Sequence, residues 1–202
     1  LPEYHDAPER VREEINIRTD SLKQRHESPG EDGFKRSPLA YQELYEEKLR
    51  LLTLLFDTAP AEALESEEVE SWAEANPWVR AYSVFRTLKE ANENRSWIEW
   101  EVLKNPTAEA IETFWSAPDN RRSTRFWAWV QLRLEQQMQS VAAEADNLGV
   151  ALKGDLPILM NEDSADVWAN REIFIQELRA GAPPDMFSYL GQNWGFPIYN
   201  WD

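Results

Sequence analysis

The 202-residue sequence contains no cysteine and only two histidines, His5 and His26. A chain without thiolates and with so few imidazoles cannot build a disulfide framework, a zinc finger or a cluster of histidine ligands, and we expect no metal and no cofactor. It also lacks an apolar run long enough to span a membrane and a segment typical of a signal peptide. These absences predict a cytoplasmic protein with no membrane partner.

Basic residues are scarce, with 21 Lys and Arg against 37 Asp and Glu and a formal net charge of -16. This charge would repel a phosphate backbone, so we expect no nucleic-acid partner. Aromatic residues are plentiful: there are ten Trp, six Tyr and eight Phe. The chain is therefore long and apolar enough to bury a sizeable core, as one domain or a domain with a subdomain.

The pattern of apolar residues divides the chain into three parts. Residues 1–38 hold few large apolar residues and mix both signs of charge, which predicts a connecting segment that is largely loop, with a short helix over 11–22 and an exposed loop over 23–37. Residues 39–118 repeat apolar residues at helical spacing and predict a helical subdomain. Residues 119–202 begin with a long amphipathic stretch, which predicts a helix over 121–147.

After that helix the pattern changes. Val150 to Leu159 is a short apolar run containing Gly154 and Pro157, which a helix would not tolerate, so it is interpreted as a buried strand that follows a crossover helix. From Asn161 onward, glycine and proline interrupt an aromatic-rich sequence repeatedly, which predicts loops.

Two features could carry chemistry. Asp155 lies at the carboxyl end of the predicted strand, where α/β folds place their sites, although it could also cap the next turn. Residues 181–195 combine Pro-Pro, glycines, amides, a carboxylate and aromatics, which suits a loop over a sugar, because aromatic rings match the C–H faces of the sugar and polar groups match its hydroxyl edges. The alternative is an aromatic-rich loop that packs over the end of a domain.

The tryptophans are expected to form two populations. Trp194 is assigned to a sugar-facing loop, and Trp168 and Trp201 are considered for the same surface. The others are assigned mainly to a helical core: Trp72, Trp78, Trp97, Trp100, Trp115, Trp127 and Trp129.

Four motifs within about fifty residues resemble the amylomaltase family of 4-alpha-glucanotransferases. They are residues 154–158 (GDLPI), 163–170 (DSADVWAN), 181–185 (GAPPD) and 191–195 (GQNWG). The resemblance covers about residues 72–202. It implies a (β/α)8 TIM barrel with a helical insertion, so we expect this chain to be mostly α, a helical insertion plus part of the barrel. It also implies transfer of an α-1,4-glucan segment to the 4-hydroxyl of an acceptor, with retention through a covalent intermediate.

The resemblance assigns roles residue by residue. Asp155 matches an aspartate that supports the sugar site without doing the bond chemistry. Asp185 and Phe187 match a lid that contacts glucan, and Gln192 and Trp194 match a wall near the scissile bond. Met186 departs from the family, since many members have an aromatic there.

No residue matches the family's nucleophile, acid/base or stabilising carboxylate. We therefore expect an internal piece of a longer enzyme, inactive alone, whose partners are maltooligosaccharides or other α-1,4-glucans. Two alternatives remain open: a structural or partner-binding helical module without catalysis, and a hydrolytic α-amylase-like parent. Because an exposed strand edge invites pairing, the strand predicted over 150–159 also suggests self-association.

Overall fold

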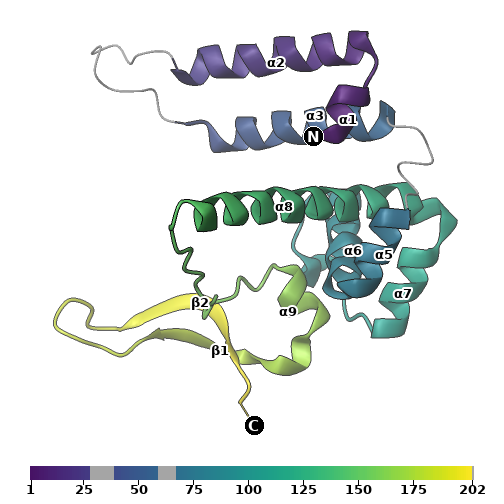
Figure 1. Cartoon of the computed structure of the whole chain (residues 1–202). Coiled ribbons are helices and arrows are strands. Elements are labelled where there is room, and N and C mark those ends of the chain that lie inside the picture. Colours follow the sequence, from purple (N-terminus) through teal and green to yellow (C-terminus); the bar gives the residue numbers. More distant parts are fainter. Residues whose placement is uncertain (28–38, 59–66, 202) are drawn as a thin grey trace. The chain divides into compact units, whose positions relative to one another are not determined.

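The computed structural model describes residues 1–27, 39–58 and 67–201 (Figure 1). It divides the chain into two compact units, Leu1–Glu67 and Glu68–Asp202. The predicted mostly helical character is confirmed. The boundary between the units falls inside the helical subdomain expected over 39–118, because the helix that begins at Tyr41 groups with the N-terminal residues.

The first unit contains three described helices, α1 (Pro2–Asp6), α2 (Glu9–Glu27) and α3 (Tyr41–Thr58). The prediction that 1–38 is largely loop is wrong for its described part, since α2 continues through Glu27. Three of its apolar residues recur at helical spacing and are buried: Val11, Ile15 and Leu22. Ion pairs from Arg18 and Arg25 to glutamates of α3 add to this packing. The loop expected over 28–37 and the side chain of His26 lie outside the described residues.

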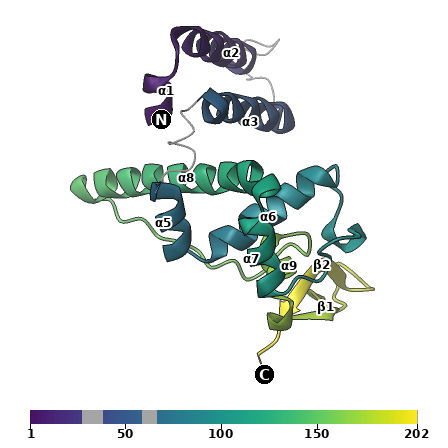
Figure 2. The ribbon, with the colours of Figure 1, turned by 90° about the vertical axis from the view of Figure 1, so that its right-hand side faces the viewer.

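The second unit holds the remaining described elements. They are α5 (Glu67–Ala75), α6 (Trp78–Ala91), η1 (Trp97–Glu99), α7 (Ala108–Ser116), η2 (Pro118–Asn120), α8 (Arg121–Asn147), α9 (Ala165–Ala169), η3 (Arg171–Ile173), β1 (Phe174–Ala182) and β2 (Gln192–Tyr199). The helix predicted over 121–147 is confirmed. Figures 1 and 2 show α5, α6 and α7 on one side of α8. None of the helices in the described ranges is both long and apolar enough to cross a membrane.

The core of this unit is aromatic. Trp115, Trp129 and Trp168 are fully buried. The sugar-facing position considered for Trp168 is therefore wrong: it packs against Phe85 at 5.6 Å between ring centroids, and its indole N–H donates to the carbonyl of Leu103 at 2.8 Å. Because its indole N–H is bonded to a backbone carbonyl, this tryptophan can be fully buried in the core.

The strand predicted over Val150–Leu159 is also wrong. The segment is irregular and largely exposed, with Leu156 and Ile158 both in water. A strand exists only where a neighbour completes its ladder, and no described residue pairs with this segment. Its contact with the hairpin is a hydrogen bond from the Tyr199 hydroxyl to the carbonyl of Pro157 at 3.0 Å. The expected self-association through an unpaired strand loses its premise here.

The sheet of the described chain lies further on, where loops were predicted. Strands β1 and β2 form a two-stranded antiparallel hairpin with irregular register, in which Phe174 faces Tyr199 and Ala182 faces Gln192. Gly181 makes the pairing possible, since a Cβ there would lie 2.1 Å from the carbonyl oxygen of Gln192. The described residues contain no parallel strand, so the barrel portion of the expected fold stays a prediction.

Candidate functional site

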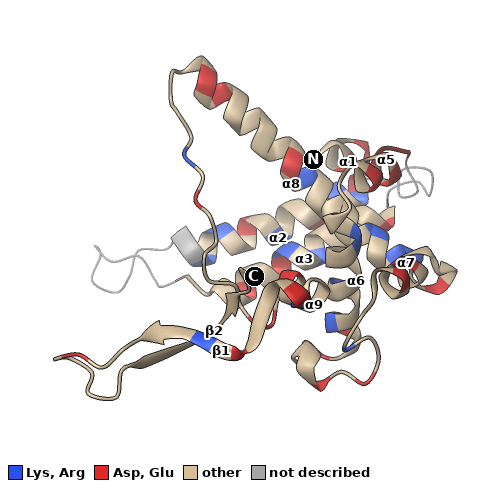
Figure 3. Ribbon diagram, turned by 90° about the horizontal axis from the view of Figure 1, so that it is seen from below, with Lys and Arg blue, Asp and Glu red and all other residues tan. Residues whose placement is uncertain are grey.

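The hairpin turn, residues 183–191, projects from the helices of its unit (Figures 1 and 3). Asp185 shapes it: its Oδ1 accepts the backbone N–H groups of Phe187 at 2.8 Å and Ser188 at 2.7 Å. The carbonyl of Ser188 in turn accepts the N–H groups of Asp185 and Gly191, both at 3.0 Å. These bonds satisfy the backbone of the turn from within, so the turn has a defined shape before any ligand arrives.

This geometry gives Asp185 a definite task. One oxygen of its carboxylate is committed to the turn, while Oδ2 has no hydrogen-bond partner among the described residues. Asp185 is also the single charged residue of the turn. The predicted lid residue can therefore both hold the lid and offer one acceptor to a polyhydroxyl ligand.

Large apolar side chains are exposed on the turn. Phe187 is 88% exposed and Tyr189 is 91% exposed, and Met186 and Leu190 are exposed to a similar degree. A contiguous apolar group of this kind on a surface marks a site of interaction rather than ordinary surface variation.

Gln192 and Trp194 lie at the start of β2, two residues apart and therefore on the same face of the strand. The indole N–H of Trp194 donates to Oε1 of Gln192 at 2.9 Å, and Trp194 remains 47% exposed. The bond orients both groups, and the amide NH₂ of Gln192 has no acceptor among the described residues. An aromatic surface thus lies beside hydrogen-bond donors, which is the combination predicted for a sugar.

Asp155 is not part of this arrangement. It is exposed in the irregular segment after α8, and within the described residues its carboxylate accepts one hydrogen bond, from the N–H of Leu156 at 2.9 Å. That bond joins adjacent residues, and no helix or turn begins here, so the capping role left open by the sequence is not seen either. Without the predicted strand, the described chain gives Asp155 no strand end from which to face a site.

Within residues 1–27, 39–58 and 67–201, no three His, Asp or Glu side chains are grouped so that they could hold a metal ion. Burial raises the pKa of Glu90, and burial lowers the pKa of Arg125 despite its pairing with Glu70. What the hairpin offers a ligand is exposed aromatic surface and hydrogen-bonding groups.

A cluster of hydrogen bonds around the buried Lys89, which we call the lock, was not predicted from the sequence. The ammonium group of Lys89 donates to the carbonyls of Asn94 and Arg95 at 2.9 and 3.0 Å and to Oδ2 of Asp163 at 2.7 Å. The other oxygen of Asp163 accepts the N–H of Trp97 at 3.3 Å. The lock fixes the segment that leads into α9 and β1. A lysine on the apolar face of α6 was the available signal, since such a charge needs a partner.

Comparison with known proteins shows which family this chain is similar to. The family model described as 4-alpha-glucanotransferase matches residues 4–202. A 4-alpha-glucanotransferase of Chlamydia caviae is 39% identical over 139 residues, which are 68% of this chain and 26% of that protein. A 4-alpha-glucanotransferase of Aquifex aeolicus is 34% identical over 184 residues, which are 85% of this chain and 36% of that protein. The chain thus spans about a quarter to a third of the length of these relatives.

The fold has a counterpart among solved structures. An amylomaltase from Streptococcus agalactiae, solved in complex with acarbose, superposes with a TM-score of 0.70 at 24% identity, over 93% of this chain and 40% of that one. At this identity the likeness concerns the fold.

Proposed function

This chain belongs to the 4-alpha-glucanotransferase family, and we propose that it supplies a glucan-binding surface for the transfer of an α-1,4-glucan segment to the 4-hydroxyl of an acceptor glucan. The observation that carries the proposal is the hairpin. Its turn is shaped by internal hydrogen bonds and exposes aromatic side chains, and an ordered Trp194–Gln192 pair lies at the start of β2. Its ligands would be maltooligosaccharides or other α-1,4-glucans, in the cytoplasm.

Each predicted site residue has a place in this proposal. Phe187 and Trp194 present apolar surface to the C–H faces of glucose rings. Gln192 donates its amide protons to hydroxyls, and Asp185 holds the turn and accepts with its free oxygen. Asp155 supports the neighbouring site, a role that rests on the family resemblance.

The bond chemistry would use groups outside these residues. In a retaining transfer, one carboxylate attacks the anomeric carbon and a second carboxyl group protonates the leaving oxygen. The acceptor hydroxyl then attacks the glycosyl-enzyme intermediate and releases the enzyme carboxylate. Water must be kept from attacking the intermediate first, because it would hydrolyse it. Apolar side chains on the turn contribute here by excluding water beside the intermediate. We propose that this chain contributes binding and water exclusion, and that it is inactive alone.

Two measurements on the 202-residue chain test the proposal. Isothermal titration should detect maltohexaose binding that is weakened about fivefold by Trp194→Ala, because a stacked ring is worth about 1 kcal/mol. Ile17→Ala, which removes an exposed apolar side chain from α2, is the matched control and should bind like the parent chain. No glucose should be released from maltotriose.

The other outcomes separate the alternatives. Absence of maltohexaose binding would favour a structural or partner-binding module, for which the self-contained aromatic core is the supporting observation. Glucose release from maltotriose by this chain would contradict its inactivity. In the longer enzyme, products that all stay shorter than the substrate would favour a hydrolytic parent, whereas a ladder above substrate length supports transfer.

A further inference from the structure

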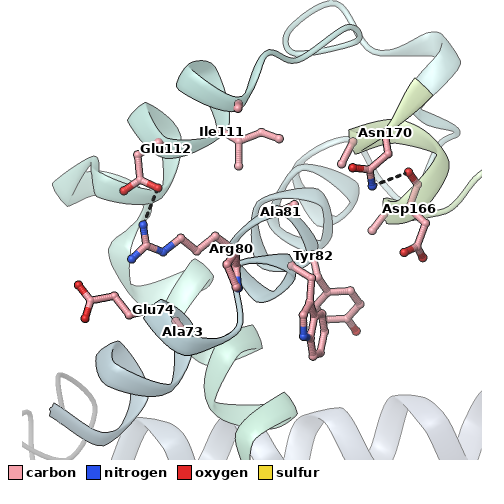
Figure 4. A pocket seen from close by; sticks show the side chains of 14 residues that line it. Ala73, Glu74, Arg80, Ala81, Tyr82, Ile111, Glu112, Asp166 and Asn170 are labelled. Atoms are coloured by element: carbon pink, nitrogen blue, oxygen red, sulfur yellow. Dashed lines mark hydrogen bonds and ion pairs between the residues drawn. The ribbon is translucent and has the colours of Figure 1, made fainter. Parts of the chain in front are cut away.

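A cleft lies on the helical side of the same unit, away from the hairpin. It is a cleft of about 840 Å³ bordered by α5, α6, α7 and α9 (Figure 4). Its lining includes no residue of the turn or of β2. Its volume falls in the range of sites that bind small molecules. Small side chains keep the cleft open, among them Ala81 of α6 and Ala169 of α9.

An aromatic wall lines this cleft. Trp78 is 53% exposed although it begins a helix whose next residue, Val79, is completely buried. Its ring meets that of Tyr82 edge to face at 6.3 Å, and Tyr82 meets the buried Trp127 at 6.4 Å. The exposed tryptophan is thereby braced against the core, which makes it a rigid surface that loses little conformational freedom when a ligand binds.

Polar groups stand at both ends of the cleft (Figure 4). At one end Glu74 lies near the ion pair of Arg80 with Glu112, whose N–O distance is 2.8 Å. At the other end are Asp166 and Asn170, and the amide of Asn170 donates to the backbone carbonyl of Asp166 at 3.1 Å. The carboxylates of Glu74 and Asp166 have no partner among the described residues. Both ends therefore offer acceptors to hydroxyl groups.

We propose that this cleft is a second glucan-binding site, which holds an α-1,4-glucan segment against Trp78 with its hydroxyls directed to Glu74 and to Asp166. A glucose ring needs an apolar surface for its C–H face and acceptors beyond its edges, and the cleft provides these from four helices. The identity of the ligand rests on the proposed function, whereas the cleft itself does not. A site of this kind would anchor a long glucan while the hairpin handles another part of it.

The proposal is tested by titrating the 202-residue chain with maltotriose and observing the indole N–H signals by nuclear magnetic resonance. In the background of Trp194→Ala, the Trp78 signal should still shift with maltotriose. Trp78→Ala should weaken this remaining binding about tenfold, and Ala81→Leu, which fills the cleft and keeps Trp78, should do the same. Leu148→Ala, at an exposed position beyond α8, is the control that should change nothing.

The two sites can fail separately. If Trp78→Ala and Ala81→Leu bind maltotriose like the chain that carries only Trp194→Ala, the cleft proposal is overturned, whatever the hairpin does. If Trp194→Ala alone is without effect but the cleft variants lose binding, the proposed role of the hairpin fails and the cleft stands. Binding of tetramethylammonium at Trp78 with no response to maltotriose would assign the cleft to a cation and overturn the proposal.

Discussion

The second unit uses the same residue types for opposite purposes in two places. In the helical core, Phe85, Trp100 and Trp168 pack ring against ring at 5.4 to 6.1 Å, and the indole N–H groups of both tryptophans are satisfied by backbone carbonyls. On the hairpin, Phe187 and Tyr189 stand almost wholly in water on a turn held by backbone hydrogen bonds. Aromatic residues in the first place stabilise the fold, and in the second they remain available for a ligand. Composition alone does not distinguish them.

The largest difference should come from removing one tryptophan of each kind. Trp168→Ala should lower the free energy of unfolding by about 4 kcal/mol, because it leaves a large cavity in the core. Trp194→Ala should lower it by less than about 1 kcal/mol, because its side chain is half exposed. Urea unfolding followed by circular dichroism measures both, and equal losses would break the comparison.

Buried and exposed ion pairs should show the same contrast, with smaller changes in unfolding free energy. The guanidinium of Arg125 is buried against the Trp115 ring at 3.5 Å, pairs with Glu70 through two nitrogens and donates to the carbonyl of Trp115 at 3.0 Å. Arg125→Ala should cost about 3 kcal/mol of unfolding free energy, since it removes the ion pair with Glu70 and the hydrogen bond to Trp115 and uncovers the Trp115 ring. Arg133→Ala, which removes a pair with the half-exposed Glu68, should cost less than about 1 kcal/mol in the same urea experiment. If the two variants unfold at the same urea concentration, burial does not set the strength of these pairs.

Loss of the hydrogen bonds that shape the hairpin turn should weaken glucan binding without lowering the stability of the core. Asp185→Ala removes both hydrogen bonds that shape the turn and should weaken maltohexaose binding about fivefold, with no change in the urea midpoint of the core. Asp185→Asn keeps an oxygen acceptor at the same place and should restore most of the affinity. If Asn binds as poorly as Ala in isothermal titration, the carboxylate acts through its charge, and the positioning role is wrong.

The smallest effect concerns the pH dependence of stability, through Glu90 near the end of α6. Burial raises the pKa of Glu90 above its ordinary value, against the opposing hydrogen bond from the Trp127 indole. The folded state therefore holds the proton to higher pH than the unfolded state does. The stability that this proton provides is complete below the ordinary pKa and is lost as the pH rises through the raised one.

Glu90→Gln should remove this part of the pH dependence. Urea unfolding between about pH 4 and about pH 8 should show a shallower loss of stability in Glu90→Gln than in the parent chain. Glu135→Gln, at an exposed position of α8, is the matched control and should follow the parent chain. Parallel curves for the parent chain and Glu90→Gln would mean that Glu90 titrates alike in both states.

Local patterns predicted the helices of this protein better than its sheet. The bounds of α8 follow from an amphipathic stretch that ends just before Gly149, whose φ of 69° suits the end of a helix. The hairpin was missed because Gly181 and Gly191 interrupt the apolar alternation, although their missing side chains are what allow the strands and the turn to approach closely.

Contacts between distant residues were beyond the reach of the sequence. Whether residues 150–159 form a strand depends on a partner elsewhere, and composition does not supply it. The Lys89–Asp163 lock joins residues 74 positions apart, and the burial of Trp168 follows from the packing of α9 on the same core. The hairpin residues of the candidate site came from motifs, but the turn geometry that orders them came from the structure.

The most direct test observes both kinds of tryptophan in one experiment. The indole N–H signals of Trp194 and Trp168 should be followed by nuclear magnetic resonance while maltohexaose is added to the 202-residue chain. If the hairpin is the glucan-binding surface, the Trp194 signal will move with saturating glucan and the signal of the buried Trp168 will stay in place. A Trp194 signal that does not move at saturating glucan would contradict the account.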